Sequence, residues 1–441
     1  MRKRLLAIIA TVAMVVAMMP SMVFGATTVS NLTDLRTALA SGGTVVLGDN
    51  ISMGESDTTI EIPAGVTVTL DLNGKTLSQT KAATSPGYQV ILNDGNLTIK
   101  DGVGTGKISY TDSGSGGEYI SDTIYNRANL VIDGGTIENL SSATVASNGY
   151  PHAVDTYSGI RDTSTTINGG TIYCENYSAI RMFCVSATNK ADLVINGGTI
   201  KGAIDMQNGT KVAALGSLKI NDGDFDTTKN ANNIRFANWG NGFPDNEFGI
   251  TAVIEGGEFD GGITSQYVPT ASNWNKKVVS GGVFPENKVD EYISDNADKA
   301  TVTNPDGTKS TAVGTETIRE VIENAPAGTS VVIDKTTAGA DYGTPAGGVE
   351  VTNKTDNIIV VGGENITKDQ SVVGETPTPP EEPGEETEQP EVNEGEESEA
   401  IPEPEDEVDT GDNMNVVIPF AIAALALAAM GTVVATRRRH N

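Results

Sequence analysis

The chain has 441 residues, with 29 Lys and Arg against 58 Asp and Glu, two Cys and 50 Gly. A net charge of −29 excludes binding to nucleic acid through a general cationic surface, and two cysteines exclude a disulfide framework or a cysteine-rich zinc cluster. The frequent glycines and the 5% of aromatic residues favour many short elements joined by turns over a helical bundle.

Residues 1–25 have the three parts of a secretory signal peptide. Three basic residues at positions 2–4 precede an apolar stretch, Leu5–Met19, and small or tolerated residues precede a predicted cleavage site after Gly25. The alternative is an N-terminal membrane anchor, which the shortness of the apolar stretch disfavours. The sequence therefore predicts export.

Residues 26–284 carry a repeat that predicts stacked coils of β-strand. A phrase of one apolar residue, Asn or Asp, Gly-Gly, Thr and Ile recurs with looser copies, and the spacing between copies is 25 to 35 residues. The copies begin at Leu72, Ile132, Ile167, Ile195, Ile220, Ile254 and Val279, and an interrupted copy runs from Ile99 to Ile108. Each reads as a strand, a tight turn that needs positive φ, and another strand. One copy cannot bury its apolar face, but stacked copies share a continuous interior.

These eight copies resemble the right-handed parallel β-helix of the pectin-lyase-like superfamily over residues 44–284. We therefore expect an all-β chain, a right-handed parallel β-helix solenoid whose open N-terminal end is capped by an amphipathic helix over residues 31–40. The superfamily includes lyases and glycosidases. Hydrolysis needs two carboxylates at a set separation, and a lyase of this superfamily needs a calcium-binding acid cluster beside a basic residue.

The coils show no local pattern of either enzymatic kind. His152 with Asp155 is the one His–acid pairing in the predicted ectodomain, and we interpret it as part of a loop. The sequence therefore predicts no catalytic residue, no metal ligand and no cofactor, and it favours a role other than catalysis.

Two columns of side chains are expected along the coils. The residue before the double glycine should tie the turns together, and it reads Asn73, Lys100, Asp133, Asn168, Asn196, Asn221, Glu255 and Ser280. A second column should point outward, because each of its members follows a buried Ile; it reads Tyr125, Arg161, Arg181, Asp205, Arg235 and Thr264.

The second column supplies the candidate ligand-binding residues Tyr125, Arg161, Arg181 and Arg235. Arg161 beside Arg181 would be an unfavourable like-charge pair unless an acid or a ligand lies between them. We therefore expect this pair to bind an anionic group of a glycan, such as a carboxylate. The alternatives are that Arg181, Asp205 and Arg235 form a ladder of alternating charge, or that the arginines are merely solvated.

Aromatic residues in a long insert add two more candidates, Trp239 and Phe243. Sugar faces stack on such rings, and binding residues concentrate on loops held by rigid scaffolds. The alternative is that these rings pack onto the coil below. Cys174 and Cys184 should both face inward on one coil, where they form either a disulfide or two buried thiols.

Residues 285–370 predict a small α+β module that caps the C-terminal end of the solenoid. The spacing of Thr317 and Glu320 is that of a capping box, which would begin a helix that ends at Asn324. Strands are expected over residues 330–334, 349–352 and 358–361.

Residues 371–412 predict a disordered acidic stalk. The part from Gly374 to Asp412 holds 17 acidic residues and no Lys or Arg, so it cannot bury enough apolar surface to fold. Residues 416–436 are uncharged and long enough for one transmembrane helix, and residues 437–441 form a basic cytoplasmic tail.

The arrangement of Thr410-Gly411, an apolar span and a basic tail resembles the cell-wall sorting signal of Gram-positive surface proteins. The resemblance implies that a sortase cleaves between Thr410 and Gly411 and joins the chain to peptidoglycan. Val408-Asp409 replaces the usual Leu-Pro-x, so an uncleaved membrane anchor is the alternative.

Together these features predict a protein exported to the surface of a Gram-positive bacterium and anchored to its cell wall or membrane. We expect an adhesin or glycan-binding protein whose partners are acidic or neutral glycans, peptidoglycan and the membrane. Two alternatives stay open: a polysaccharide-degrading lyase or glycoside hydrolase, and a passive structural surface protein.

Overall fold

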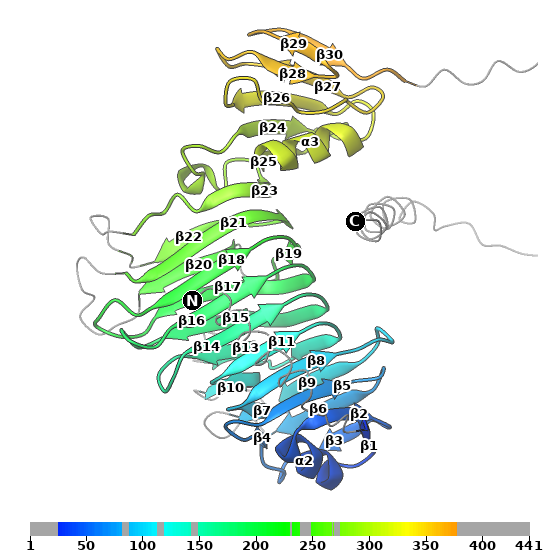
Figure 1. Cartoon of the computed structure of the whole chain (residues 1–441), viewed down its shortest axis with the longest axis vertical. Coiled ribbons are helices and arrows are strands. Elements are labelled where there is room, and N and C mark those ends of the chain that lie inside the picture. The colour runs from blue at the N-terminus through cyan, green and yellow to red at the C-terminus, as the bar shows by residue number, and fades with distance from the viewer. Residues whose placement is uncertain are drawn as a thin grey trace, which may run out of the picture. The chain divides into compact units, whose positions relative to one another are not determined.

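The computed structural model describes residues 25–81, 88–112, 119–142, 149–229, 232–238, 248–266, 268 and 274–376. These residues form a parallel β-solenoid of about seven turns, mostly β with few helices, so the prediction of stacked β-coils is confirmed (Figure 1). Residues 1–24 and 377–441 lie outside the described residues, and with them the signal peptide, most of the stalk, the sorting motif and the membrane span. Within the described part of the chain, none of the helices has the length and apolar character needed to span a membrane.

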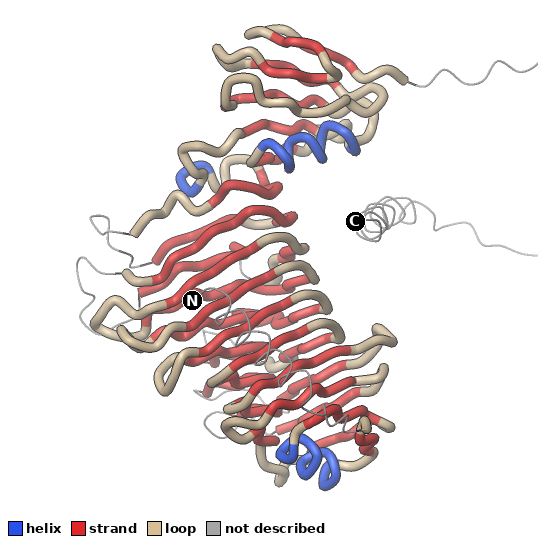
Figure 2. The backbone as a smooth tube through the Cα atoms, viewed as in Figure 1, coloured by secondary structure: helices blue, strands red, loops and turns tan. Residues whose placement is uncertain are grey.

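Most coils contribute strands to three parallel ladders (Figure 2). The first ladder contains β2 (Gly43–Leu47), β5 (Thr67–Asp71), β8 (Asn96–Lys100), β11 (Asn129–Ile132), β14 (Thr163–Ile167), β16 (Ala191–Ile195), β18 (Gly216–Ile220) and β21 (Ile250–Phe259). The second contains β3 (Ile51–Met53), β6 (Thr76–Lys81), β9 (Lys107–Asp112), β12 (Thr136–Asn139), the first parts of β15 (Thr171–Cys184) and β17 (Thr199–Asn208), β19 (Asp224–Asp226), the end of β21, and β23 (Val279–Pro285).

The third ladder carries the candidate site. It contains β4 (Ile60–Ile62), β7 (Tyr88–Asn93), β10 (Tyr119–Asn126), β13 (Gly149–Tyr157), the last parts of β15 and β17, β20 (Asn232–Asn238) and β22 (Gly262–Gln266).

The repeat phrase explains both the core and the turns. Ile132, Ile167 and Ile195 align in register and are fully buried, and each such burial contributes roughly 1.5–3 kcal/mol. The turn after each needs glycine: Gly170 has φ of 82°, and a Cβ there would lie 2.4 Å from the carbonyl oxygen of Gly135 in the preceding coil.

Helix α2 (Leu32–Ser41) closes the N-terminal end, as expected. The side chain of Asn31 accepts a hydrogen bond from the Asp34 N–H at 3.0 Å, and Leu35 and Leu39 are buried in the same core as the coils. β1 (Thr27–Val29) pairs with β2. The helix thus covers apolar surface that the first coil would otherwise expose.

The C-terminal part changes from parallel to mostly antiparallel pairing, with one parallel pair of strands, Ser330–Lys335 with Glu350–Asn353, within it. β23 pairs antiparallel with β25 (Lys309–Val313), which is followed across the sheet by β24 (Lys299–Thr303), β26 (Ser330–Lys335), β27 (Glu350–Asn353) and β30 (Ser371–Val373). A short helix, η2 (Asp290–Tyr292), precedes these strands, and β28 (Ile359–Val361) pairs separately with β29 (Glu364–Ile366).

The predicted capping box in this part is wrong. Helix α3 (Thr315–Asn324) begins after Gly314, and no side chain caps its N-terminus. Thr317 therefore lies within the first turn of the helix, where its hydroxyl accepts a hydrogen bond from the Gly282 N–H at 3.1 Å. This residue links the helix to the last strand of the solenoid.

Candidate functional site

The predicted outward column runs along the third ladder, but Asp155 replaces Arg161 as one of its members. The register aligns Tyr125 with Asp155 and Asp155 with Arg181, and the column continues through Asp205, Arg235 and Thr264. Asp155 therefore occupies the position expected for Arg161, and the predicted Arg161–Arg181 like-charge pair is wrong. The structure places an acid between Tyr125 and Arg181, which removes the repulsion on which that prediction depended.

Arg161 lies elsewhere, beside Asp94. Its Nη1 donates to the Asp94 carbonyl oxygen at 2.9 Å, and its Nη2 lies 3.7 Å from Asp94 Oδ1. The preceding residue, Ile160, is 52% exposed and so does not mark a buried strand position. Val154 is the buried residue that aligns with Ile124 and Ile180, and its neighbour is Asp155.

Four residues of this column, Asp155, Arg181, Asp205 and Arg235, form two ion pairs, and we call them the charged column. Arg181 donates from Nε to Asp155 Oδ1 at 2.9 Å and from Nη2 to Oδ2, and both aspartates of the column are fully buried. Arg235 binds Asp205 in the same two-point way, with Nε 3.0 Å from Oδ1, and its Nη2 donates to the Tyr177 hydroxyl at 2.6 Å. Such planar, bidentate pairs are strong and directional.

Burial alone would lower the pKa of Arg181, but the carboxylate of Asp155, with smaller effects of Asp122 and Asp205, raises that pKa above its usual value. The side chains of Arg181 and Arg235 are only 10% and 20% exposed. The charges therefore alternate along the column, but the expectation that its side chains are exposed is wrong for Asp155, Arg181 and Asp205, which are buried. The arginines are already neutralised by aspartates.

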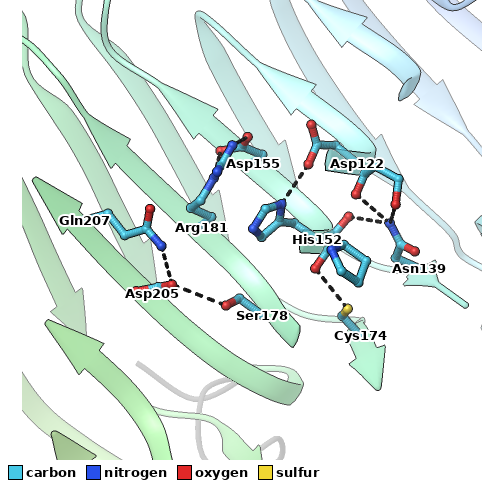
Figure 3. A network of polar contacts seen from close by, with 11 residues as sticks. Asp122, Asn139, His152, Asp155, Cys174, Ser178, Arg181, Asp205 and Gln207 are labelled. Carbon is cyan, nitrogen blue, oxygen red and sulfur yellow. Dashed lines mark hydrogen bonds and ion pairs between the residues drawn. The ribbon is translucent and has the colours of Figure 1, made fainter. Parts of the chain in front are cut away.

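A second group lies beside the charged column (Figure 3). His152 aligns with Asp122 on one side and Ser178 on the other, and its Nδ1 lies 2.9 Å from Asp122 Oδ1. His152 is fully buried and Asp122 is 1% exposed. Burial, with smaller effects of Arg181 and Arg235, holds the pKa of His152 well below its usual value, so the imidazole is neutral at pH 7. Burial, and then Asp155, raises the pKa of Asp122 well above its usual value.

Sequence reasoning missed this group. It assigned His152 to a loop and did not single out Asp122. The signal that could have identified the pair is their matching position, each two residues before a buried strand residue, Ile124 or Val154. Asp122, His152 and Asp155 each have one oxygen or nitrogen atom that could bind a metal ion, and these three atoms lie within 4.8 Å of one another.

Three half-buried rings, Tyr125, Tyr157 and Phe183, follow one another across successive coils, and we call them the aromatic row. The ring centroids of Tyr125 and Tyr157 are 6.1 Å apart, and those of Tyr157 and Phe183 are 6.0 Å apart. Glycine makes room for two of them: a Cβ at Gly159 would lie 2.2 Å from the Tyr157 ring, and one at Gly209 would lie 2.1 Å from the Phe183 ring. The rings of Tyr157 and Phe183 therefore lie against bare backbone, and all three rings stay partly exposed.

The remaining candidates differ in outcome. Trp239 and Phe243 lie outside the described residues, as do Thr410 and Gly411. Cys174 and Cys184 are buried free thiols, which is the second of the two alternatives, and burial raises the pKa of each to about 12. Neither thiol is therefore poised as a nucleophile.

The column at the turns forms a chain of side-chain hydrogen bonds that we call the amide column. Asn168 donates to Asp133 at 2.7 Å, Asn196 donates to Asn168 at 2.7 Å, and Asn221 donates to Asn196 at 2.6 Å. The structural interpretation of this column is therefore supported. The four side chains from Asp133 to Asn221 bind one another, whereas Asn73 and Ser280 donate to the backbone carbonyl oxygens of Leu47 and Ile254, both at 3.1 Å.

No family model matches this chain, and neither does any curated protein or solved structure. The resemblance to the pectin-lyase-like superfamily therefore rests on the repeat phrase alone.

Proposed function

We propose that this protein is an exported, surface-anchored β-helix adhesin that binds glycans. Residues 1–25 would direct export, and residues 408–441 would attach the chain to peptidoglycan through a sortase or hold it in the membrane of a Gram-positive bacterium. The proposal includes the finer assignment of the solenoid to the right-handed, pectin-lyase-like type. The observation that carries the binding function is the aromatic row.

The aromatic row has the features of a sugar-binding platform. The apolar faces of sugars stack on aromatic rings, and rings fixed on a rigid sheet lose little freedom when they bind. One ring per coil along the solenoid axis suits a linear chain of sugars rather than a single one. Arg127, whose side chain is 25% exposed and whose guanidinium lies 5.9 Å from the Tyr125 ring, adds a donor for sugar hydroxyls.

The charged column narrows the ligand class. Arg181 and Arg235 are each paired with a buried aspartate, so neither offers a free cation to an acidic sugar. The net charge of −29 also repels polyanions. Neutral glycans are therefore the favoured ligands over acidic ones.

The test is binding of the full chain, in detergent, to an array of neutral and acidic glycans. Tyr157→Ala and Phe183→Ala should each weaken binding to the best neutral ligand by roughly fivefold to tenfold, because each removes one stacking surface. Tyr173→Ala is the matched control: Tyr173 is also half-buried, but it pairs within the second ladder and should bind as the wild type does.

Saturable binding that is unaffected by both row variants would refute the assigned site, and an array with no neutral ligand would refute the function. Mass spectrometry of the bound glycans adds an independent check. Shortened or unsaturated products would replace the adhesin with a polysaccharide-degrading enzyme.

A further inference from the structure

Two arginines share one carboxylate where the chain passes from the third ladder into the first. Asp94, Arg127 and Arg161 lie in the connections that follow β7, β10 and β13, so three successive coils supply one residue each. Arg127 binds Asp94 at two points, from Nε to Oδ1 at 3.0 Å and from Nη2 to Oδ2. Arg161 reaches back two coils, and its Nη1 donates to the Asp94 carbonyl oxygen at 2.9 Å.

This group has one positive charge in excess. Asp94 Oδ1, which accepts from Arg127 Nε at 3.0 Å, also lies 3.7 Å from Arg161 Nη2, so a single carboxylate faces two guanidinium groups. Within the described residues, neither arginine forms another ion pair. Asp162 follows Arg161 in the chain, but its Oδ1 accepts from the Lys190 N–H at 2.8 Å. The charged column differs, because each of its arginines has its own aspartate.

Both guanidinium groups are open to solvent and have donors to spare. The side chains of Arg127 and Arg161 are 25% and 38% exposed. A guanidinium has five N–H donors, of which Arg127 uses two and Arg161 uses one in hydrogen bonds with described residues. The planar fork of an arginine matches the oxygens of a carboxylate, sulfate or phosphate. Neighbouring like charges are also unfavourable, so a further anion would relieve their repulsion.

We propose that Arg127 and Arg161 bind one anionic group, a carboxylate or a sulfate, at the end of a glycan whose neutral part lies on the aromatic row. This site rests on the proposed function, since it belongs to the same binding surface. Arg127 connects the two parts, because its guanidinium carbon lies 5.9 Å from the ring centroid of Tyr125, at one end of the row. An anionic group next to a sugar stacked on Tyr125 would therefore meet both arginines.

The rest of the protein limits the ligand to one such group. Arg181 and Arg235, farther along the third ladder, are neutralised by buried aspartates, and the net charge of −29 repels polyanions. A single positive charge in excess suits a single negative charge. The ligand class is therefore a neutral sugar chain with one acidic end group, and not a polyacidic glycan.

The experiment compares two ligands that differ only in charge. The neutral oligosaccharide that binds best on the array is oxidised at its terminal sugar to a carboxylic acid, and the methyl ester of that acid is the uncharged counterpart. Binding of each to the full chain in detergent is measured by calorimetry at pH 7. We expect the wild type to bind the acid about tenfold more tightly than the ester, because hydrogen bonds to charged groups are strong.

Two variants locate the preference for the acid. Arg161→Gln should lower it to about twofold or less and leave binding of the ester unchanged, since one arginine then faces one carboxylate. Asp94→Asn should raise it above that of the wild type, because the competing carboxylate is gone while the amide oxygen still accepts from Arg127. A gain of this kind cannot arise from unfolding. Arg319→Gln is the matched control: Arg319 is 31% exposed and paired with Glu316, and its loss should change neither affinity.

A further measurement needs no glycan. Sulfate titrated into the free protein should shift the Nε–H resonances of Arg127 and Arg161, which the two Arg→Gln variants identify. The site is overturned if sulfate shifts neither resonance, if Arg161→Gln keeps the preference for the acid, or if Asp94→Asn does not raise it. Equal binding of acid and ester that still depends on Tyr157 would overturn this site alone. Binding of both ligands that survives Tyr157→Ala would instead refute the aromatic row.

Discussion

The amide column and the charged column both place one side chain per coil along the same solenoid, yet they differ in chemistry and burial. The amide column lies at the exposed turns and is built mostly of neutral side chains linked by similar hydrogen bonds of 2.6–2.7 Å. The charged column lies on the third ladder and is nearly buried, with alternating Asp and Arg.

The two columns differ because one lies within the repeat phrase and the other lies between its copies. Residues of the amide column belong to the repeat phrase itself, so similar side chains stack and no charge has to be balanced. The charged column lies between copies of the phrase, where residues vary from coil to coil and each charge needs its own partner. The repeated residues thus form the scaffold, whereas the residues that vary from coil to coil form the candidate sites. Replacing one residue should accordingly lower the free energy of unfolding a little in the amide column and much more in the charged column.

Arg181→Ala should have the largest effect on stability. It leaves Asp155 buried with its charge uncompensated, and breaking a buried pair in this way typically costs about 3–5 kcal/mol. Denaturant unfolding of the variant, followed by circular dichroism, measures the loss. Arg161→Ala is the control, because its contact with Asp94 is more exposed and should be worth less than about 1 kcal/mol. Similar losses in both variants would contradict the comparison.

Asn196→Ala should have a smaller effect, about 0.5–1.5 kcal/mol. Asn196 donates to Asn168 and accepts from Asn221, so its removal interrupts the amide column at one coil, but water can replace both contacts at the surface. The same unfolding measurement applies. A loss as large as that of Arg181→Ala would mean that the exposed column contributes as much as the buried one.

A pair of facing carboxylates, Asp224 and Glu258, should have the smallest effect on stability, and that effect should depend on pH. Asp224 and Glu258 lie opposite each other in adjacent coils of the second ladder. Partial burial, and then the neighbouring carboxylates, raise the pKa values of Asp224 and Glu258 above their ordinary values of 3.8 and 4.5, although both side chains keep much of their surface in contact with solvent. The folded state therefore holds these protons more tightly than the unfolded state. This contribution to stability is fully present below the ordinary pKa values and is lost as pH rises through the raised ones.

Glu258→Gln should remove part of this loss. Unfolding free energies measured between pH 4 and pH 7 should fall less steeply for the variant than for the wild type, with a gain of a few tenths of a kcal/mol at pH 7 because both side chains are exposed. Glu255→Gln is the control, since Glu255 pairs with Lys219 and should gain nothing. A steeper fall in Glu258→Gln would reverse the sign of the argument.

Much of the scaffold could be predicted from the sequence because its causes are local. The Gly-Gly turn, the buried Ile on each side of it and the period of 25 to 35 residues together require stacked coils. The capping helix over residues 31–40 could be predicted equally well, since Asn31 precedes a helical pattern of buried leucines. The error at Thr317 shows the limit of such signals: the spacing matched a capping box, but Gly314 set the start of the helix.

The candidate site could not be read in the same way, because it depends on which residues face each other across coils. Inserts between the copies differ in length, so counting from one Ile placed Arg161 in a position that Asp155 occupies. His152 and Asp122 come together because β10 and β13 pair with a particular register. The sequence by itself determined that the chain forms coils, since each coil follows from local pattern. Only the tertiary structure decided which charges meet, because hydrogen bonding between neighbouring backbones fixes that register.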